Sequence, residues 1–178
     1  MKRREFLKIG TASACLLALT HALNRPADAH AMPQTSYQKI SADDVTCLKA
    51  LVPVILAGAL PDNALEHALA VDEVIQAFDR TVVGLSPALQ KEVGELMSLL
   101  TLGFTRRYIV GVAKPWPEAS AADIQAFLNN WRDSRFALLQ QGYLALVRVI
   151  TACWYGNARS WPQIGYPGPP YAKELGLL

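Results

Sequence analysis

The apolar residues of this chain recur at the period of an α-helix, and this spacing is the feature that most limits its fold. Between residues 41 and 155 they repeat every three or four positions, which places them along one face of a helix. No segment shows the strict alternation of apolar and polar residues that is typical of a half-buried strand. The sequence therefore predicts an all-α fold, in one domain of about four to five helices.

Capping residues and turn residues mark the first two predicted helices. Ser41 and Asp44 form a capping-box pattern at the start of a helix over 41–58, and Pro53 predicts a kink or a division within it. Turn residues follow, and a second helix is predicted over 63–83. The apolar side of this second helix carries Leu65, Leu69, Val71, Val74, Ile75 and Phe78.

Two longer helices are predicted in the second half of the chain. Ser86 and Pro87 provide a cap and a first-turn proline for a helix that continues to Val110. The sequence Lys-Pro-Trp-Pro at 114–117 interrupts the pattern. Ser120 then caps a helix that we expect to run without a break to Tyr155.

The first 29 residues have the organisation of an export signal. A basic start precedes an uncharged run from Ile9 to Thr20, and small residues follow it. Ala27 and Ala29 predict exit sites before His30 and before Met32. The uncharged run is shorter than the ~20 residues that a membrane-spanning helix needs, so we expect no transmembrane span.

The basic start also matches the twin-arginine export motif, with Lys2 where Ser or Thr is usual. The matching residues are Arg3, Arg4, Phe6, Leu7 and Lys8. Twin-arginine transport carries proteins that are already folded, and such proteins commonly hold a cofactor or travel bound to a partner. We therefore expect a mature domain over 30–178 that works in the periplasm, an oxidising compartment where disulfides persist.

Charge and composition exclude several function classes. Residues 1–29 carry five basic and two acidic residues, a net charge of +3, so the rest carries 12 basic and 13 acidic residues, a net charge of −1. This balance argues against a nucleic-acid partner, which would need a concentrated basic surface. At 52% hydrophobic and 18% charged residues, the chain is also unlike a disordered protein.

The motifs of the common cofactor and nucleophile sites are absent from the sequence. It contains no Cys-x-x-Cys-His, no Gly-rich phosphate loop, no Gly-x-Gly-x-x-Gly and no Gly-x-Ser-x-Gly. His67 has no second histidine near it, which makes it a poor metal ligand. We therefore predict no catalytic, cofactor-binding or metal-binding residue in this chain.

The C-terminal segment differs in kind from the helices. Between residues 154 and 171 it combines two tryptophans and three tyrosines with four prolines, and we predict that 154–178 forms an extended aromatic tail. Such a tail either wraps its own helices or lies on another protein, where Trp and Tyr side chains dominate binding energy. The two alternatives are compatible.

Residues 127–170 contain a series of short motifs: Trp131-Arg-Asp-Ser134, Leu138-Leu139, Tyr143, Trp154-Tyr155-Gly156, Ser160-Trp161 and Ile164-Gly-Tyr-Pro-Gly-Pro-Pro170. With the twin-arginine leader and the size of the helical body, these motifs resemble the gluconate 2-dehydrogenase subunit 3 family, the small subunits of membrane-bound flavoprotein dehydrogenases. Residues 41–110 match in character only.

The resemblance implies a non-catalytic subunit of an oxidoreductase complex. In this family the large subunit is an FAD enzyme of the glucose–methanol–choline type that oxidises sugars, sugar acids or related alcohols, and a multihaem cytochrome c commonly takes its electrons. The large subunit often lacks a leader, so the small subunit escorts it through the twin-arginine pathway. The expected partner-binding residues are Trp131, Ser134, Tyr143, Trp154, Tyr155, Trp161, Gly165, Tyr166, Pro167, Gly168, Pro169 and Pro170.

The mature chain keeps two cysteines, Cys47 and Cys153, and three alternatives remain open for them. Cys153 can be a buried free thiol that packs as a small hydrophobe, or it can form a disulfide with Cys47. The third alternative is a bond to the large subunit, because some related small subunits carry such a cysteine. A different function class also stays open, namely a free-standing periplasmic binding protein with a small-molecule pocket lined by the aromatic tail.

Overall fold

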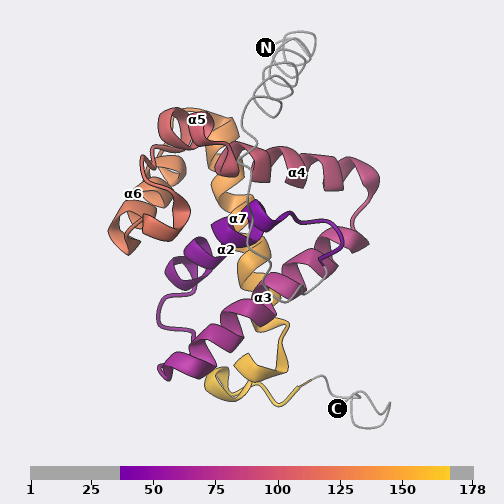
Figure 1. The fold of residues 1–178 in the computed structure, drawn as a ribbon. Coiled ribbons are helices and arrows are strands. Elements are labelled where there is room, and N and C mark those ends of the chain that lie inside the picture. Colours follow the sequence, from indigo (N-terminus) through magenta and orange to yellow (C-terminus); the bar gives the residue numbers. More distant parts are fainter. Residues whose placement is uncertain (1–36, 169–178) are drawn as a thin grey trace.

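The computed structural model describes residues 37–168, and all regular structure in this range is helical (Figure 1). The α-helices are α2 (Ala42–Ile55), α3 (Ala64–Gly84), α4 (Pro87–Thr101), α5 (Gly103–Thr105), α6 (Ala121–Arg132) and α7 (Ala137–Tyr155). The shorter turns are the π-helical η1 (Arg106–Val110) and the 3-10 turns η2 (Trp116–Glu118), η3 (Ala158–Ser160) and η4 (Pro162–Ile164). The all-α prediction is confirmed, and the expected number of helices was too low.

Some of the predicted site residues lie outside the described range. These are the export-motif residues Arg3, Arg4, Phe6, Leu7 and Lys8, the exit-site residues Ala27 and Ala29, and Pro169 and Pro170.

The helix starts follow the capping residues seen in the sequence. Ser41 and Asp44 form a capping box at α2, and Ser120 forms one with Asp123 at α6, since each serine Oγ accepts from the N3 backbone and each aspartate accepts from the cap backbone. Ser86 caps α4 with a proline in the first turn. Pro53 lies in the last turn of α2, which ends two residues later.

Both of the longer helices predicted from the sequence are divided in the structure. The third stops at Thr101, Leu102 has extended backbone angles (φ −65°, ψ 126°), and α5 and η1 follow as separate short turns. The fourth is interrupted after Arg132, and the Ser134 Oγ accepts a hydrogen bond from the Phe136 backbone N–H at 3.1 Å. This local side-chain bond satisfies a donor that a continuous helix would use, so the chain turns here even though the apolar period continues.

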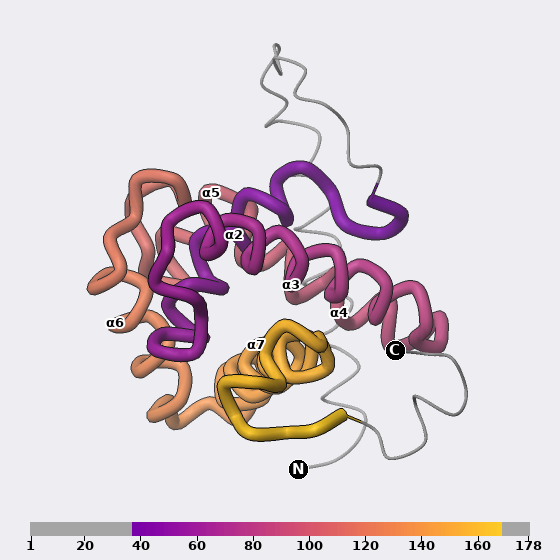
Figure 2. Tube along the Cα trace, turned by 90° about the horizontal axis from the view of Figure 1, so that it is seen from below, coloured from indigo at the N-terminus to yellow at the C-terminus, as the bar shows by residue number. Residues whose placement is uncertain are grey.

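α2 lies at the centre of the bundle, where it contacts α3, α4, α6 and α7 (Figure 1). Four of its side chains are buried: Cys47, Leu48, Leu51 and Val52. Seen from below, α7 lies beside α3 and continues from the α6 side of the molecule (Figure 2). Since α3 and α6 each pack on α7, the hydrophobic core is continuous from one side of the bundle to the other.

Aromatic residues join α6 to α7 and η2. Phe127 packs edge-on against both Trp131, with ring centroids 4.9 Å apart, and Trp116, at 6.1 Å. The Trp116 indole N–H donates to the Leu100 carbonyl at 2.9 Å. Gly142 of α7 faces the Trp131 ring, and a Cβ at this position would lie 2.8 Å from Trp131 Cζ3. α6 and α7 therefore approach closely because residue 142 has no side chain.

The core side of α3 begins later than the sequence pattern indicates. Leu65 and Leu69 were expected on its apolar side, but they are 71% and 47% exposed. The buried residues start at Ala70, because the first turns of α3 lie at the lower end of the molecule, beyond α2, α4 and α6 (Figure 1). No helix among residues 37–168 is both long enough and apolar enough to cross a membrane.

Candidate partner interface at the C-terminal turns

Residues 154–168 form the end of a helix and short turns, whereas the sequence predicted an extended tail over 154–178; residues 169–178 lie outside the described range. Trp154 and Tyr155 complete the last turn of α7, and the chain then forms η3 and η4. The Asn157 Oδ1 accepts from the Arg159 N–H at 2.9 Å and so caps η3. Gly165 has φ +66° and Gly168 has φ +94°, which are backbone conformations that glycine adopts without strain. Prolines and glycines thus close tight turns here.

A charged clamp holds these turns against α3. The Glu73 carboxylate accepts two hydrogen bonds from the Arg159 guanidinium, at 2.8 and 3.0 Å, and one from Asn157 Nδ2 at 2.7 Å. The bonds from Arg159 are the main cause that lowers the pKa of Glu73, and those from Glu73 raise the pKa of Arg159. About a third of each side chain is exposed, so this ion pair adds little to the stability of the fold. Its two parallel hydrogen bonds mainly fix the orientation of the two side chains.

The aromatic side chains at this end are ordered by one another. The Trp161 and Tyr166 rings meet edge-on, with centroids 5.4 Å apart. The Trp161 indole N–H donates to the Tyr155 carbonyl at 3.1 Å, which ties η4 back to the end of α7. Tyr155, Ile164 and Tyr166 are each between 40% and 51% exposed. The backbone that carries them is therefore fixed, while a large part of each side chain faces solvent.

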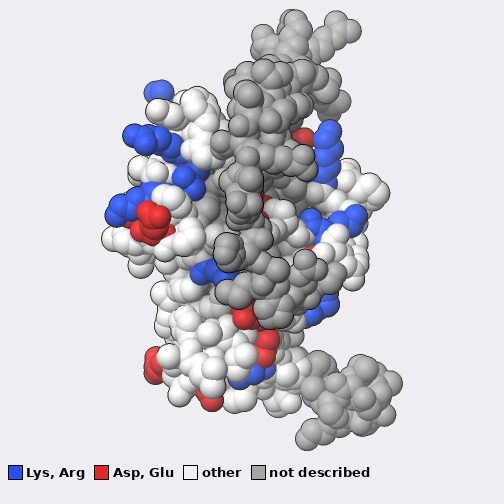
Figure 3. All heavy atoms as spheres, viewed as in Figure 1, with Lys and Arg blue, Asp and Glu red and all other residues white. Residues whose placement is uncertain are grey.

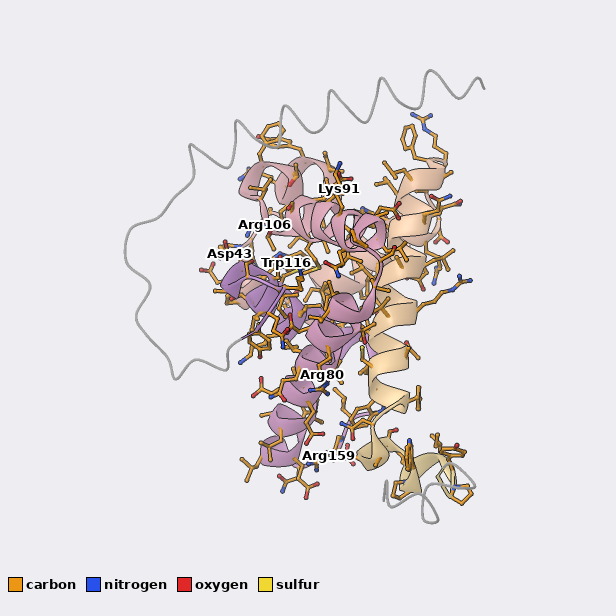
Figure 4. All side chains as sticks on the ribbon, turned by 90° about the vertical axis from the view of Figure 1, so that its right-hand side faces the viewer. Asp43, Arg80, Lys91, Arg106, Trp116 and Arg159 are labelled. Carbon is orange, nitrogen blue, oxygen red and sulfur yellow. The ribbon has the colours of Figure 1, made fainter. Side chains whose placement is uncertain are left out.

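The start of α3 brings two more exposed apolar side chains to the same end of the molecule. Leu69 lies one helical turn before Glu73, the residue that holds η3, and Leu65 lies one turn before Leu69. Figure 4 shows Arg159 at this lower end, beside α3 and below α7. We call these five residues the C-terminal patch: Leu65, Leu69, Tyr155, Ile164 and Tyr166.

The other predicted partner-binding residues lie elsewhere. Trp131 and Trp154 are 2% and 1% exposed, so they belong to the core, and the expectation that they contact a partner is wrong for this fold. Neither indole N–H has an acceptor within the described part of the chain. Tyr143 is half-buried against the core, and Ser134 lies in the α6–α7 link. Tyr143 and Ser134 are therefore not part of the C-terminal patch. Pro167 is exposed and Gly168 is buried.

The two mature cysteines are free thiols buried in the core, and they do not form a disulfide with each other. Cys47 of α2 is fully buried. Cys153 of α7 is 7% exposed, and its Sγ lies 3.7 Å from the Thr81 Oγ1. Burial raises the pKa of both thiols, which keeps them protonated and slow to react. Of the three alternatives, the buried free thiol matches this arrangement.

Two hollows on the surface of residues 37–168 lie away from the C-terminal patch. One has a volume of about 370 Å³ and lies between α2, η2 and α6, with Trp116 and Pro53 in its wall and Lys49 as its one charged lining residue. The other, about 300 Å³, lies between α4 and the chain at the start of α2, with Val82 of α3 in its wall. No residue of the C-terminal patch lines either hollow. Within residues 37–168, no three His, Cys, Asp or Glu side chains lie close enough together to hold a metal ion.

No protein-family model matches this sequence, and no curated protein or solved structure is significantly similar to it.

Proposed function

We propose that this chain is a non-catalytic accessory subunit of a periplasmic flavoprotein dehydrogenase of the glucose–methanol–choline type. The large subunit of that complex holds FAD and oxidises a sugar, a sugar acid or a related alcohol, and a multihaem cytochrome c is the expected electron acceptor. The small subunit supplies the twin-arginine leader and escorts the folded large subunit during export. The proposal follows the resemblance of residues 127–170 to gluconate 2-dehydrogenase subunit 3.

The observation that carries the proposal is the C-terminal patch. Tyrosine and large aliphatic side chains provide the apolar contact area of protein interfaces, and they bind best when they are already held in the bound conformation. Here the Glu73–Arg159 clamp and the Trp161 indole bond hold the turns that carry three of the five side chains. This arrangement supports binding of a protein surface more than binding of a small molecule, because none of the five lines either hollow.

The hydrogen bonds that fix the chain shortly after the predicted leader support the export role. The buried Asp79 carboxylate of α3 accepts backbone hydrogen bonds from Gln38 and Lys39, each at 2.9 Å, and from Ile40 at 3.1 Å. This fixes the chain only eight positions after His30, the first residue after the first predicted exit site. A leader placed so close to a folded domain suits a pathway that transports folded proteins.

The experiment is a pull-down of the full chain, tagged at its C-terminus, from periplasm and membranes. We expect a yellow complex with a large flavoprotein. Leu65→Asp together with Ile164→Asp should release that partner, whereas Leu89→Asp on α4, a matched exposed leucine, should retain it. A colourless monomer from the unchanged chain would contradict the proposal.

A second arm tests export. Arg3→Lys together with Arg4→Lys should leave the partner in the cytoplasm, because the pathway reads the arginine pair. The matched control is Lys2→Arg, which keeps the charge and both arginines and should leave export intact. If the partner still reaches the periplasm when both arginines are replaced, the escort role is wrong.

A further inference from the structure

A second group of exposed apolar side chains lies at the end of the molecule opposite the C-terminal patch. Phe104, Tyr108 and Ile109 of α5 and η1 are 57%, 68% and 45% exposed. Phe136 and Leu138, at the start of α7, are 57% and 67% exposed. α7 begins at the level of α5 and runs down to the C-terminal turns (Figure 1), so both sets lie at the end of the molecule away from these turns.

Each of these two sets carries an arginine over an aromatic ring. The Arg107 guanidinium lies 6.0 Å from the centroid of Tyr108, and that of Arg135 lies 5.0 Å from the centroid of Phe136. Neither guanidinium has an acidic partner within 4.0 Å among residues 37–168. The two sets therefore present the same combination, an unpaired cation beside a protruding ring.

The net charge of the region that contains both sets is also positive. Residues 103–148 contain six basic and three acidic residues, a net charge of +3, whereas residues 37–102 contain four basic and nine acidic residues, a net charge of −5. Figure 3 shows Lys and Arg side chains gathered over α5 and α6, with an acidic group beside them. Of the three acidic residues, Asp133 pairs with Arg132 at 2.9 Å and Asp123 caps α6, so both are already engaged.

We infer that the end formed by α5, η1 and the α6–α7 link docks directly on an anionic lipid surface. Aromatic rings favour the membrane–water interface, and arginines near the surface are attracted to anionic headgroups. No helix in the described range spans a membrane, so the contact is peripheral.

This inference uses only the surface of residues 37–168 and does not depend on the proposed partner. It places the docking end and the C-terminal patch at opposite ends of α7 (Figure 1). A molecule held at the membrane by the first end would therefore keep the second free for a protein.

The test uses the full chain with sedimenting vesicles of phosphatidylglycerol and phosphatidylethanolamine, compared with phosphatidylcholine alone. Arg107→Glu with Arg135→Glu should lower the partition coefficient by about tenfold or more, since each cation near the surface contributes to binding. The matched control, Lys49→Glu with Arg80→Glu, changes net charge equally on other faces and should change binding far less. Tyr108→Ser with Phe136→Ser should also weaken binding, without a change in charge.

A position-specific readout separates docking by this end from binding by the leader. An environment-sensitive fluorophore is attached to Tyr108→Cys, and separately to Leu65→Cys, in a Cys15→Ser background. We expect a blue shift with anionic vesicles at position 108 and none at position 65. Equal loss of binding in the two charge-reversal variants, or a shift at position 65 but not at 108, would overturn the inference. Binding of an acidic protein at this end, with no binding to vesicles and no blue shift, would also overturn the inference.

Discussion

Replacing Gly142 by alanine tests the closest contact in the core. Its Cβ would lie 2.8 Å from Trp131 Cζ3, 3.2 Å from Trp131 Cε3 and 3.5 Å from Leu96 Cδ1. The Trp131 ring cannot move freely, because it is 2% exposed and packs on Phe127. Overpacking of this kind costs roughly 1–3 kcal/mol, while alanine gains about 1 kcal/mol in helix propensity. We expect Gly142→Ala to lower the free energy of unfolding by about 1 kcal/mol.

Gly94→Ala is the matched control for this substitution. Gly94 is also inside a helix, α4, but a Cβ there would meet no atom within 4 Å. It should therefore raise the free energy of unfolding by roughly 0.5–1 kcal/mol through propensity alone. Urea unfolding followed by tryptophan fluorescence measures both, and the difference between the two variants isolates the packing cost. If Gly142→Ala proves as stable as Gly94→Ala, the close approach of α6 and α7 is not the reason for glycine at position 142.

Three further predictions concern the ends of the domain and its thiols. Asp79→Ala should lower the free energy of unfolding by about 2–3 kcal/mol and expose residues 37–41 to proteolysis, because three backbone N–H groups lose their acceptor. Asp79→Asn should lower the free energy of unfolding less, because one acceptor oxygen remains. The pKa of Glu73 is lowered in the folded state, so the stability from the Arg159 clamp is complete above the usual carboxyl pKa of about 4.3 and is lost as the pH falls through the folded-state pKa. Glu73→Gln should therefore reduce the loss of unfolding free energy between neutral and acid pH, and an unchanged dependence on pH would argue against the clamp. Cys47 and Cys153 should react with a thiol reagent only after denaturation. The denatured chain that begins at His30 should then show two reactive thiols, and a count of zero would show a disulfide instead.

Local sequence determined where helices begin and which class of fold they build. The capping boxes at Ser41 and Ser120, and the serine cap and first-turn proline of α4, act within four residues of the chain, so they depend little on what packs around them. The absence of alternating patterns was equally decisive, since strands need period 2 to bury one face. These features predicted the all-α architecture and most helix starts.

The site was harder to predict, because an aromatic side chain gives the same signal whether it is buried or bound. Trp131 and Trp161 were both expected to contact a partner, yet one is in the core and the other supports the surface of the C-terminal turns. The Glu73–Arg159 clamp joins residues 86 positions apart, and nothing in the local sequence of either indicates the other. The periodicity of α3 likewise could not show that Leu65 projects beyond its neighbours.

Helical periodicity by itself thus determined which side of each segment is apolar, but only the tertiary structure decided what covers it. The division of the predicted helix over 120–155 into α6 and α7 illustrates this, because the apolar period passes through the break unchanged. The turn lets Trp131 fold back onto Gly142 and bury its ring against a second helix. Burial depends on which elements meet in space, and that is a property of the whole chain, whereas capping and periodicity are properties of a few neighbouring residues.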